Sequence, residues 1–417
     1  MIQLPTMTLI YRLSIVFYQL AIRVVAPFNL KARQWAQGRK NIFERIKKQV
    51  QTDRPLVWVH CASLGEFEQG RPLIEHIKKN HPQYRVLLTF FSPSGYEIRK
   101  NYEQADYIFY LPADTPKNAR RFIDLVKPEK VFFVKYEFWP FYFKVLKAKN
   151  IPLYIISAIF RPDQLFFKPG LIGNWYRKVL AGVDHFFVQN DESVGLLNSL
   201  GFQNVTRAGD TRFDRVAEIA ANSRQLPLIE KFKSDRKLVV IGSSWKPDEE
   251  LIIQYINEHE GIKFIFAPHE IKPQNIERIL SSVNKPGIRL SAADSEDINT
   301  YDVLLIDSIG LLSSVYKYAD LAYIGGGFGV GIHNTLEAAI FNIPVLFGPN
   351  YLRFNEAVTL EQLNVAYPVR NYQELKTAFE KLLSDDVLRD EISKSCRFFT
   401  QSNLGATRTI VSKVFNN

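Results

Sequence analysis

Cysteine is almost absent from this chain. Only Cys61 and Cys396 occur among 417 residues, which excludes a disulfide framework and a metal site built from several thiolates. This scarcity favours a protein of a reducing compartment.

Several motifs of phosphate and metal chemistry are missing as well. The sequence contains no G-x-x-x-x-G-K-[ST] segment and no H-E-x-x-H segment, so it indicates neither a P-loop nor a metalloprotease-like site. Glycines are concentrated at 325–331, but Val330 and Ile332 occupy the third glycine positions of a G-x-G-x-x-G fingerprint. Hydride transfer and P-loop chemistry therefore lose support, and we expect a metal-independent mechanism without a cofactor.

The chain also lacks a long uninterrupted apolar run. Residues 10–26 are apolar, but Arg12, Gln19 and Arg23 interrupt them and fall along one stripe of a helix. A spanning helix needs about 20 apolar residues with few charges, and the small-residue cleavage site of a signal peptide is absent. We therefore expect residues 1–48 to form an interfacial helix and a basic segment at a membrane. The alternative is a first helix packed on its domain, with a solvated basic face after it.

The charge balance is strongly positive, with a formal net charge of +10 at pH 7. Such an excess implies an anionic partner, and nucleic acid, anionic lipid and a phosphorylated substrate all fit it. Part of the charge follows the apolar N-terminus directly, in a run suited to anionic headgroups on the cytoplasmic side. The cations of this run are Lys31, Arg33, Arg39, Lys40, Arg45, Lys47 and Lys48.

After about residue 53, short β-rich runs alternate with amphipathic helical stretches. The runs are almost continuously apolar, as expected of parallel strands buried on both faces, and the gaps leave room for crossover helices. They lie at 56–62, 85–91, 107–112, 130–136, 152–158 and 185–190, and then at 238–244, 263–269, 302–307, 321–327 and 344–348.

The sequence thus predicts an α/β fold of two doubly wound domains in tandem. We expect the first domain at 49–209, a polar, strand-poor linker at 210–236, and the second domain with C-terminal helices at 237–417. Ligands of such sheets bind beyond the carboxyl ends of the strands, so two facing sheets would place the active site in the cleft between domains.

Two glutamates of the first domain stand at strand ends. Glu66 follows strand 56–62, where a general base could stand, but Ser63 and Glu66 also match a helix-capping box, and the residues leave both interpretations open. Glu137 lies among aromatic residues at the end of strand 130–136. The cost of burying its charge favours a functional role over a simple helix-start carboxylate.

Arg212 would bring a permanent cation to the end of the first domain. Residue type alone favours a surface ion pair with Asp210 or Asp214 over a functional role.

The second domain has three candidate segments. Loop 242–244 follows a strand and suits the approach of a phosphate. The glycines of 325–331 leave backbone N–H groups free to approach a ligand, and Asn334 then opens a helix with Glu337 three residues later, which favours nucleotide or sugar binding. His269 ends strand 263–269 on the ligand side, where a helix-start residue and a binding residue are equally compatible with the pattern.

Five segments together resemble one known family, the 3-deoxy-D-manno-octulosonic acid (Kdo) transferases. In order they are W-V-H-C-A-S-L-G-E at 58–66, Y-E-F-W-P at 136–140, G-D-T-R-F-D at 209–214, D-S-I-G-L-L at 307–312 and H-N-T-L-E at 333–337. The order matches over almost the whole chain, including the apolar N-terminus and the basic segment after it.

The resemblance implies the GT-B fold, with two Rossmann-like domains facing a cleft, at the cytoplasmic face of the bacterial inner membrane. It implies CMP-Kdo as donor, a lipid A precursor (lipid IVA) as acceptor, and inversion by direct displacement. By carry-over, Glu66 matches the general base, and Glu137 and Arg212 match positions that stabilise the transition state. The CMP-binding positions would be His269, Ile309, Gly310, Leu311, Asn334, Thr335, Leu336 and Glu337. No nucleic acid partner is implied.

Three positions depart from the family pattern. Arg212 stands where the family has lysine, so the charge survives but its geometry need not. The family's P-R-H motif lacks its arginine here, next to His269, and Leu311 replaces a glutamate. Two alternatives remain: another GT-B enzyme that uses a nucleoside-diphosphate sugar, and a non-catalytic protein that binds anionic lipid or nucleic acid, whose binding would fall steeply with salt.

Overall fold

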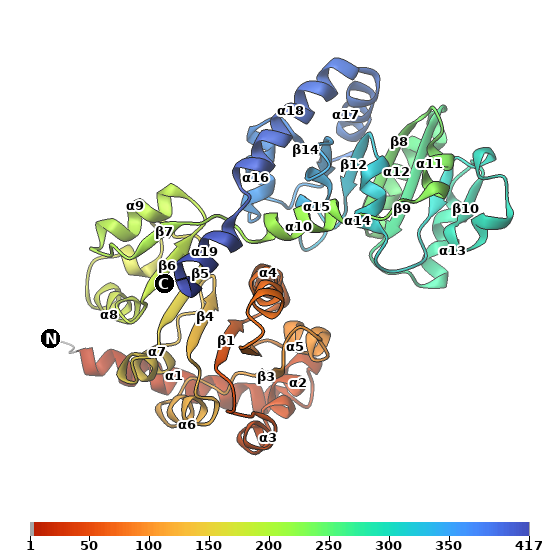
Figure 1. Cartoon of the computed structure of the whole chain (residues 1–417). Helices are drawn as coiled ribbons and strands as arrows, with labels where there is room; N and C mark the ends of the chain where they lie inside the picture. Colours follow the sequence, from red (N-terminus) through yellow and green to blue (C-terminus); the bar gives the residue numbers. More distant parts are fainter. Residues whose placement is uncertain (1–3, 417) are drawn as a thin grey trace. The chain divides into compact units, whose positions relative to one another are not determined.

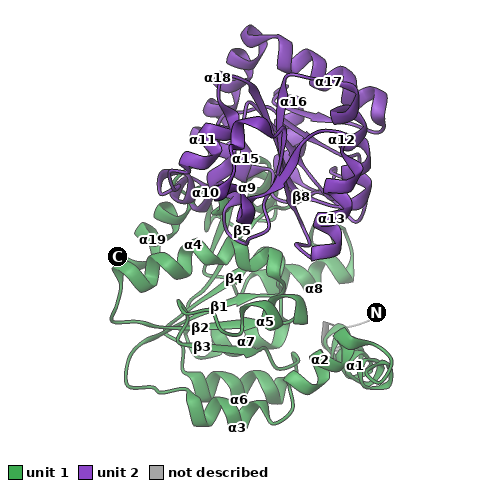
Figure 2. Cartoon of the chain, turned by 90° about the vertical axis from the view of Figure 1, so that its right-hand side faces the viewer, with its two compact units in different colours: residues 1–214, 404–417 green, residues 215–403 purple. Residues whose placement is uncertain are grey.

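Two parallel β-sheets organise the chain, one in each of two α/β units (Figure 1). The computed structural model describes residues 4–416. Unit 1 comprises Met1–Asp214 and Leu404–Asn417, and unit 2 comprises Arg215–Asn403 (Figure 2). The predicted fold class of two doubly wound α/β domains is confirmed.

Unit 1 is built on a seven-stranded sheet in the order β3-β2-β1-β4-β5-β6-β7. Its strands are β1 (Leu56–Cys61), β2 (Arg85–Phe90), β3 (Tyr107–Tyr110), β4 (Lys130–Val134), β5 (Leu153–Ala158), β6 (His185–Val188) and β7 (Val205–Arg207). Its helices are α1 (Leu4–Val25), α2 (Leu30–Gly38), α3 (Ile42–Gln49), α4 (Leu64–Asn80), α5 (Pro93–Arg99), α6 (Pro116–Val126), α7 (Pro140–Ala148), η1 (Leu165–Phe167), α8 (Leu171–Leu180), α9 (Asp191–Ser199) and α19 (Ala406–Phe415).

Strand β1 shows why these runs form a two-faced sheet. All six of its residues are buried, because successive side chains point to opposite faces and helices cover both. Trp58 joins one core cluster, whereas Val57 and Val59 join the other. Since Trp58 and His60 share a face, His60 is also fully buried.

Unit 2 is built on a second seven-stranded parallel sheet, in the order β10-β11-β9-β8-β12-β13-β14. Its strands are β8 (Lys237–Ser244), β9 (Ile262–Pro268), β10 (Gly287–Arg289), β11 (Val303–Leu305), β12 (Leu321–Ile324), β13 (Val345–Phe347) and β14 (Ala366–Pro368). Its helices are α11 (Pro227–Lys233), α12 (Lys246–Glu258), α13 (Pro273–Ser282), η2 (Leu290–Ser295), η3 (Ile298–Thr300), α14 (Leu312–Val315), η4 (Tyr316–Tyr318), α15 (Leu336–Ala339), α16 (Asn355–Gln362), α17 (Tyr372–Ser384) and α18 (Asp386–Ser402).

Three strands were not expected from the sequence: β7, β10 and β14. Each has only three residues and lies at an edge of its sheet. Edge strands are buried on fewer sides than central ones, so they need no continuous apolar run.

The expected domain boundaries differ from the observed units in two respects. The segment expected to be a strand-poor linker contains helices α10 (Arg212–Ala221) and α11, and the division between units falls after Asp214. Residues 404–417, expected in the second domain, belong to unit 1 instead. The amphipathic pattern of a C-terminal helix does not specify which core its apolar face covers.

Helix α19 is held on unit 1 by apolar packing and by one carboxylate. Ile410, Val411 and Val414 are buried in the core cluster that also contains β1 residues. The carboxylate of Asp214 accepts hydrogen bonds from the backbone N–H groups of Gly405 and Thr407, both at 2.6 Å. These groups lie at the start of α19, where N–H groups lack partners within the helix.

Helix α1 packs on unit 1 with one face only. Tyr11 lies against Phe141 and Trp175 and donates a 2.9 Å hydrogen bond to the buried carboxylate of Asp114. Two turns later, Tyr18 contacts Phe91. The opposite face is apolar and exposed: Leu9, Ile10, Leu13, Val16, Phe17, Leu20, Val24 and Val25.

We predict that Asp214→Ala loosens α19 without unfolding the sheet of unit 1. The two N–H groups lose a charged acceptor, so the free energy of opening α19 should fall by about 1–3 kcal/mol. Hydrogen exchange of residues 406–415, followed by mass spectrometry, measures this change. Asp390→Ala removes an exposed carboxylate of α18 and serves as the control; equal protection of α19 in both variants would contradict the prediction.

Candidate active site

The strand order of the sheet in unit 1 reverses between β1 and β4. Ligands of doubly wound sheets bind at such a switch point, outside the carboxyl ends of the strands. The segments that follow β1 and β4 carry Glu66 and Glu137. The topology therefore brings the two predicted glutamates to the same position in the fold.

Glu66 lies in the first turn of α4, where the backbone N–H of Ser63 donates to its carboxylate at 2.9 Å. The capping contact expected from the sequence is therefore present. Burial raises the pKa of Glu66 to about 7, and the charge of Glu137 adds to this, whereas the Ser63 N–H and Lys135 oppose it. Near neutral pH the carboxyl group can both hold and release a proton, as general acid–base chemistry requires.

Glu137 lies beside two aromatic side chains, and one of them donates a hydrogen bond to it. The indole N–H of Trp139 donates to its Oε2 at 2.8 Å, and His60 Nε2 lies 3.5 Å from the same oxygen. His60 Nδ1 is 2.9 Å from the hydroxyl of Thr89, which also accepts from the indole of Trp58 at 2.7 Å. A buried polar chain thus runs from the core of unit 1 to Glu137.

His60 was assigned no function from the sequence. The signal that could have identified it is the strand period, because His60 sits two residues after Trp58 and must point to the same buried face. A buried histidine needs a polar partner, and Glu137 is the carboxylate beside it.

Lys135 is a second residue that sequence reasoning missed. Its φ of +61° lies in the left-handed region, which is rare for a residue that is not glycine. Its positive charge acts to lower the pKa of both Glu66 and Asp210. Backbone strain of this kind concentrates at functional sites, so Lys135 belongs to the group around the two glutamates.

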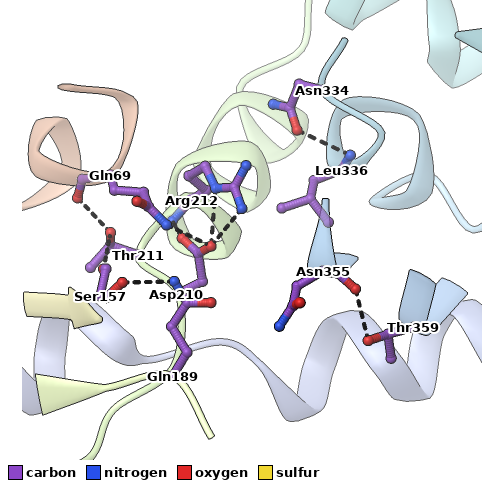
Figure 3. Close-up of polar contacts among 10 residues, drawn as sticks. All are labelled: Gln69, Ser157, Gln189, Asp210, Thr211, Arg212, Asn334, Leu336, Asn355 and Thr359. Atoms are coloured by element: carbon purple, nitrogen blue, oxygen red, sulfur yellow. Dashed lines mark hydrogen bonds and ion pairs between the residues drawn. The ribbon is translucent and has the colours of Figure 1, made fainter. Parts of the chain in front are cut away.

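Arg212 belongs to a partly buried network rather than to a surface ion pair (Figure 3). Its guanidinium lies 2.7 Å from Oδ2 of Asp210, and its backbone N–H donates to Oδ1 of Asp210 at 2.9 Å. Asp210 is buried and also accepts from Gln69 of α4 at 2.9 Å. Burial alone would raise the pKa of Asp210, but the charge and hydrogen bonds of Arg212 lower it overall.

The same network ties three segments of unit 1 together. The hydroxyl groups of Ser157 and Thr211 lie 3.0 Å apart, and Gln189 donates to the carbonyl of Ser157 at 2.8 Å. Thr211 also donates to the backbone carbonyl of Gln69. A residue of β5 and residues that follow β6 and β7 are thereby fastened to α4, one turn after Glu66 (Figure 3).

In unit 2 the strand order reverses between β8 and β12. Residues 242–244, expected to form a loop after a strand, are instead the last residues of β8, and the glycine-rich loop 325–331 follows β12. The buried carboxylate of Asp248 joins them, because it accepts from the backbone N–H groups of Trp245 and Gly326, both at 2.9 Å, and from the hydroxyl of Tyr323 at 3.0 Å.

The glycines of this loop serve close packing more than ligand access, which corrects the sequence interpretation. A Cβ on Gly325 would lie 2.4 Å from the carbonyl oxygen of Ser243, and one on Gly327 would lie 2.5 Å from the backbone N of Gly348. Gly326 has a φ of +92°. Only Gly329, next to Val330, is exposed.

Three rings stack beside the glycine-rich loop. The ring of His269 stacks on Trp245, at a centroid distance of 4.4 Å, and on His333, at 4.6 Å. The indole N–H of Trp245 donates to Nε2 of His333 at 3.2 Å, which requires that nitrogen to be unprotonated. Burial lowers the pKa of His333 to about 4, with a further contribution from His269. The structure therefore brings His269 and the H-N-T-L-E segment together.

The segment after His333 is fixed differently from the expected helix start. Helix α15 has only four residues, and Asn334 Oδ1 accepts from the N–H of Leu336 at 3.2 Å. The Asn334 amide also donates to Glu337 at 3.1 Å. Thr335 is buried, and its hydroxyl has no hydrogen-bond partner. A helix this short has little macrodipole, so side-chain groups rather than the dipole must bind a ligand here.

Ile309, Gly310 and Leu311 form the turn between β11 and α14. Gly310 adopts a φ of +93°, which explains the glycine, and Ile309 is exposed. Tyr316 directly follows helix α14. Burial raises its pKa, and the charge of Glu337 adds to this rise. Glu337 therefore lies near the end of the helix that follows the 309–311 turn.

Metal ligands are not clustered in the described residues. Within 4–416 no group of three or more His, Cys, Asp or Glu side chains is arranged to hold a metal ion.

Comparisons with known proteins place this arrangement in a family. A family model described as 3-deoxy-D-manno-octulosonic-acid transferase matches residues 37–215. The Kdo transferase of Aquifex aeolicus is 28% identical over 346 residues, covering 81% of this chain and 89% of that protein. The Kdo transferase of Bordetella pertussis is 27% identical, covering 84% of this chain and 85% of that protein. The chain is similar to Kdo transferases over most of its length.

The similarity to these curated relatives identifies the protein as a glycosyltransferase. Among solved structures, UDP-GlcNAc 2-epimerase from Neisseria meningitidis has a TM-score of 0.59 at 16% identity, over 87% of this chain and 100% of that one. MurG from Acinetobacter baumannii has a TM-score of 0.55 at 12% identity, over 87% and 100%. At such identities the likeness concerns the fold, and together with the two seven-stranded sheets it confirms the GT-B fold.

Proposed function

We propose that the protein transfers Kdo from CMP-Kdo to a lipid A precursor, lipid IVA, and releases CMP, in the synthesis of lipopolysaccharide. The similarity to Kdo transferases supports the transferred sugar, and the two switch points supply suitable groups. The observation that carries the proposal is the Glu66 carboxyl group, whose pKa of about 7 suits it to remove a proton from an acceptor hydroxyl.

In this mechanism Glu66 takes the proton of the acceptor hydroxyl while the hydroxyl oxygen attacks the anomeric carbon of Kdo. The bond to the CMP phosphate oxygen breaks in the same step, so the configuration inverts and CMP leaves as an anion. Glu137 keeps the pKa of Glu66 raised, so the proton is held at neutral pH once transferred.

Arg212, Lys135 and Glu137 would stabilise the transition state. Arg212 is permanently charged. Its ion pair with Asp210, which also accepts a hydrogen bond from Gln69, fixes its position before substrate binds. Preorganised charges cost no reorganisation during the reaction, which is why they stabilise developing charge efficiently. The arginine that replaces the family's lysine keeps this role through its ion pair with Asp210.

CMP would bind to unit 2. The stacked rings of Trp245, His269 and His333 offer an aromatic surface for the base, and the orphaned hydroxyl of Thr335 and the Asn334–Glu337 pair offer polar partners. Trp245 is 39% exposed, so a base can stack on it. This surface stands next to the position where the family's P-R-H arginine is absent.

Helix α1 would attach the protein to the cytoplasmic face of the inner membrane. By length and composition Thr6–Val25 could cross a membrane. The face that carries Tyr11 and Tyr18, however, is packed on unit 1. A helix packed along one side and apolar on the other is suited to lie in the interface.

The first test separates catalysis by Glu66 from helix capping. Glu66→Gln keeps the capping hydrogen bonds but cannot take a proton, so turnover should fall by about 10²–10⁴-fold. Because the raised pKa keeps the carboxyl protonated below about pH 7, the wild-type rate should rise with pH through that value. Single-turnover transfer of labelled Kdo measures both effects.

Glu68→Gln makes the same chemical change two residues along α4 and is the control. A Glu66→Gln variant that turns over within a few-fold of this control, with the wild-type pH profile, would end the assignment.

The second test concerns the donor site. Asn334→Ala and Glu337→Ala should each weaken CMP binding by about 1–3 kcal/mol, the usual loss for a buried polar contact. Calorimetry with CMP measures this, and Asn284→Ala, an exposed position of unit 2, should bind CMP normally. Preference for UDP or ADP over CMP in the wild type would instead favour a nucleoside-diphosphate sugar.

The third test concerns membrane attachment. The double variant Leu13→Ser and Phe17→Ser should weaken binding to lipid vesicles by about tenfold or more, since burial of each such side chain contributes about 1.5–3 kcal/mol. Co-sedimentation with vesicles measures it. Val387→Ser, an exposed apolar position of α18, is the control, and equal sedimentation of the two proteins would refute attachment through α1.

A further inference from the structure

Unit 1 contains a cavity at the side of α1 that none of the roles above uses. Its volume is about 660 Å³, within the range of about 300–1,000 Å³ that is usual for small-molecule sites. Residues of α1, α2, α3 and α6 line it, together with Pro112 and Ala113 after β3.

The lining is strongly cationic. Arg23, Arg39, Lys40 and Arg121 line the cavity with a single carboxylate, Glu44. Arg39 donates hydrogen bonds to the backbone carbonyls of Leu111, Trp35 and Phe91. The guanidinium of Arg121 packs against the ring of Phe43. Among the described residues none of the four cations forms an ion pair, so their charge is left uncompensated.

Two further features indicate that an anion completes this site. Trp35 lines the cavity and is buried, and its indole N–H has no hydrogen-bond partner. The Arg39 guanidinium packs against Trp35 at 3.9 Å and Tyr110 at 4.8 Å, and burial lowers its pKa to about 9. A buried donor and a buried cation without an acidic partner are both costly unless a ligand satisfies them.

The position of the cavity identifies the kind of molecule that would bring the anion. Gln19 and Arg23 of α1 line it, whereas Leu20 and Val24 of the same turns are exposed on the apolar face. A ligand whose apolar part lies along α1 can therefore place a polar headgroup in the cavity. The volume also exceeds what a bare phosphate fills, so a larger headgroup fits better.

We propose that this cavity binds the phosphate group of a membrane lipid, with Lys40, Arg121 and Trp35 as its donors. This inference rests on the proposed attachment of α1 to a membrane, but not on sugar transfer. The binding energy would come from charge-assisted hydrogen bonds, which phosphate oxygens accept well.

The test uses the full chain and a soluble probe, dihexanoylphosphatidic acid below its micelle concentration. Calorimetry should show one binding site, and the double variant Lys40→Gln and Arg121→Gln should lose about tenfold affinity or more. The control, Lys47→Gln and Lys48→Gln, removes the same charge from exposed positions of α3 outside the cavity and should bind like the wild type. Thermal melting verifies that each variant folds. The single variant Arg121→Lys keeps the charge and should keep most of the wild-type affinity.

Two comparison ligands identify the source of the phosphate. Inorganic phosphate should bind much more weakly than the lipid, and dihexanoylphosphatidylcholine, with a capped headgroup, should bind weakly too. Equal loss in the cavity variant and the control would show diffuse charge attraction and overturn the proposal. Inorganic phosphate that binds as tightly as the lipid would also overturn it, by assigning the site to free phosphate. No sugar transfer is measured, so this outcome is independent of the catalytic proposal.

Discussion

The reversal of strand order in each parallel sheet is the constraint on which the arrangement of functional groups depends. Connections between parallel strands are right-handed, so the crossover helices change face where the order reverses, and the two loops at that point diverge. In unit 1 these loops follow β1 and β4, and in unit 2 they follow β8 and β12. Glu66 and Glu137 in one unit, and Trp245 and the glycine-rich loop in the other, owe their proximity to this topology.

Charged groups at the unit 1 switch point are kept there at an energetic cost that their neighbours reduce. Burial and the neighbouring charge of Glu137 raise the pKa of Glu66. Lys135 reduces this rise, from a backbone conformation that is itself unfavourable. Asp210 meets the opposite condition, because Arg212 compensates its burial. Because the environments of Glu66 and Asp210 differ, Glu66 can accept a proton while Asp210 stays charged.

The sequence was sufficient for much of the fold because strands buried on both faces are recorded directly as apolar runs. It was also sufficient to locate Glu66 and Glu137, since the polar residue that follows such a run lies at the ligand edge. It was insufficient for α19, because an amphipathic helix does not specify its partner, and for Lys135, because lysine, unlike glycine or asparagine, does not indicate a positive φ. The glycines at 325–331 misled for a related reason: glycine marks a close approach, but the approaching group can be the protein's own backbone.

Helix α1 is linked to the candidate active site through one buried carboxylate. Asp114 accepts from Tyr11 of α1 and from the N–H groups of Phe141 and Tyr142, at 3.1 and 3.0 Å, in the first turn of α7. That turn begins three residues after Glu137. Since burial raises the pKa of Asp114 to about 7 and these hydrogen bonds oppose the rise, losing the Tyr11 hydroxyl would weaken the hold of the charged carboxylate on α7. Displacement of α1 therefore acts on the segment that carries Glu137, which gives the inner, aromatic face of this helix a role distinct from that of its exposed apolar face.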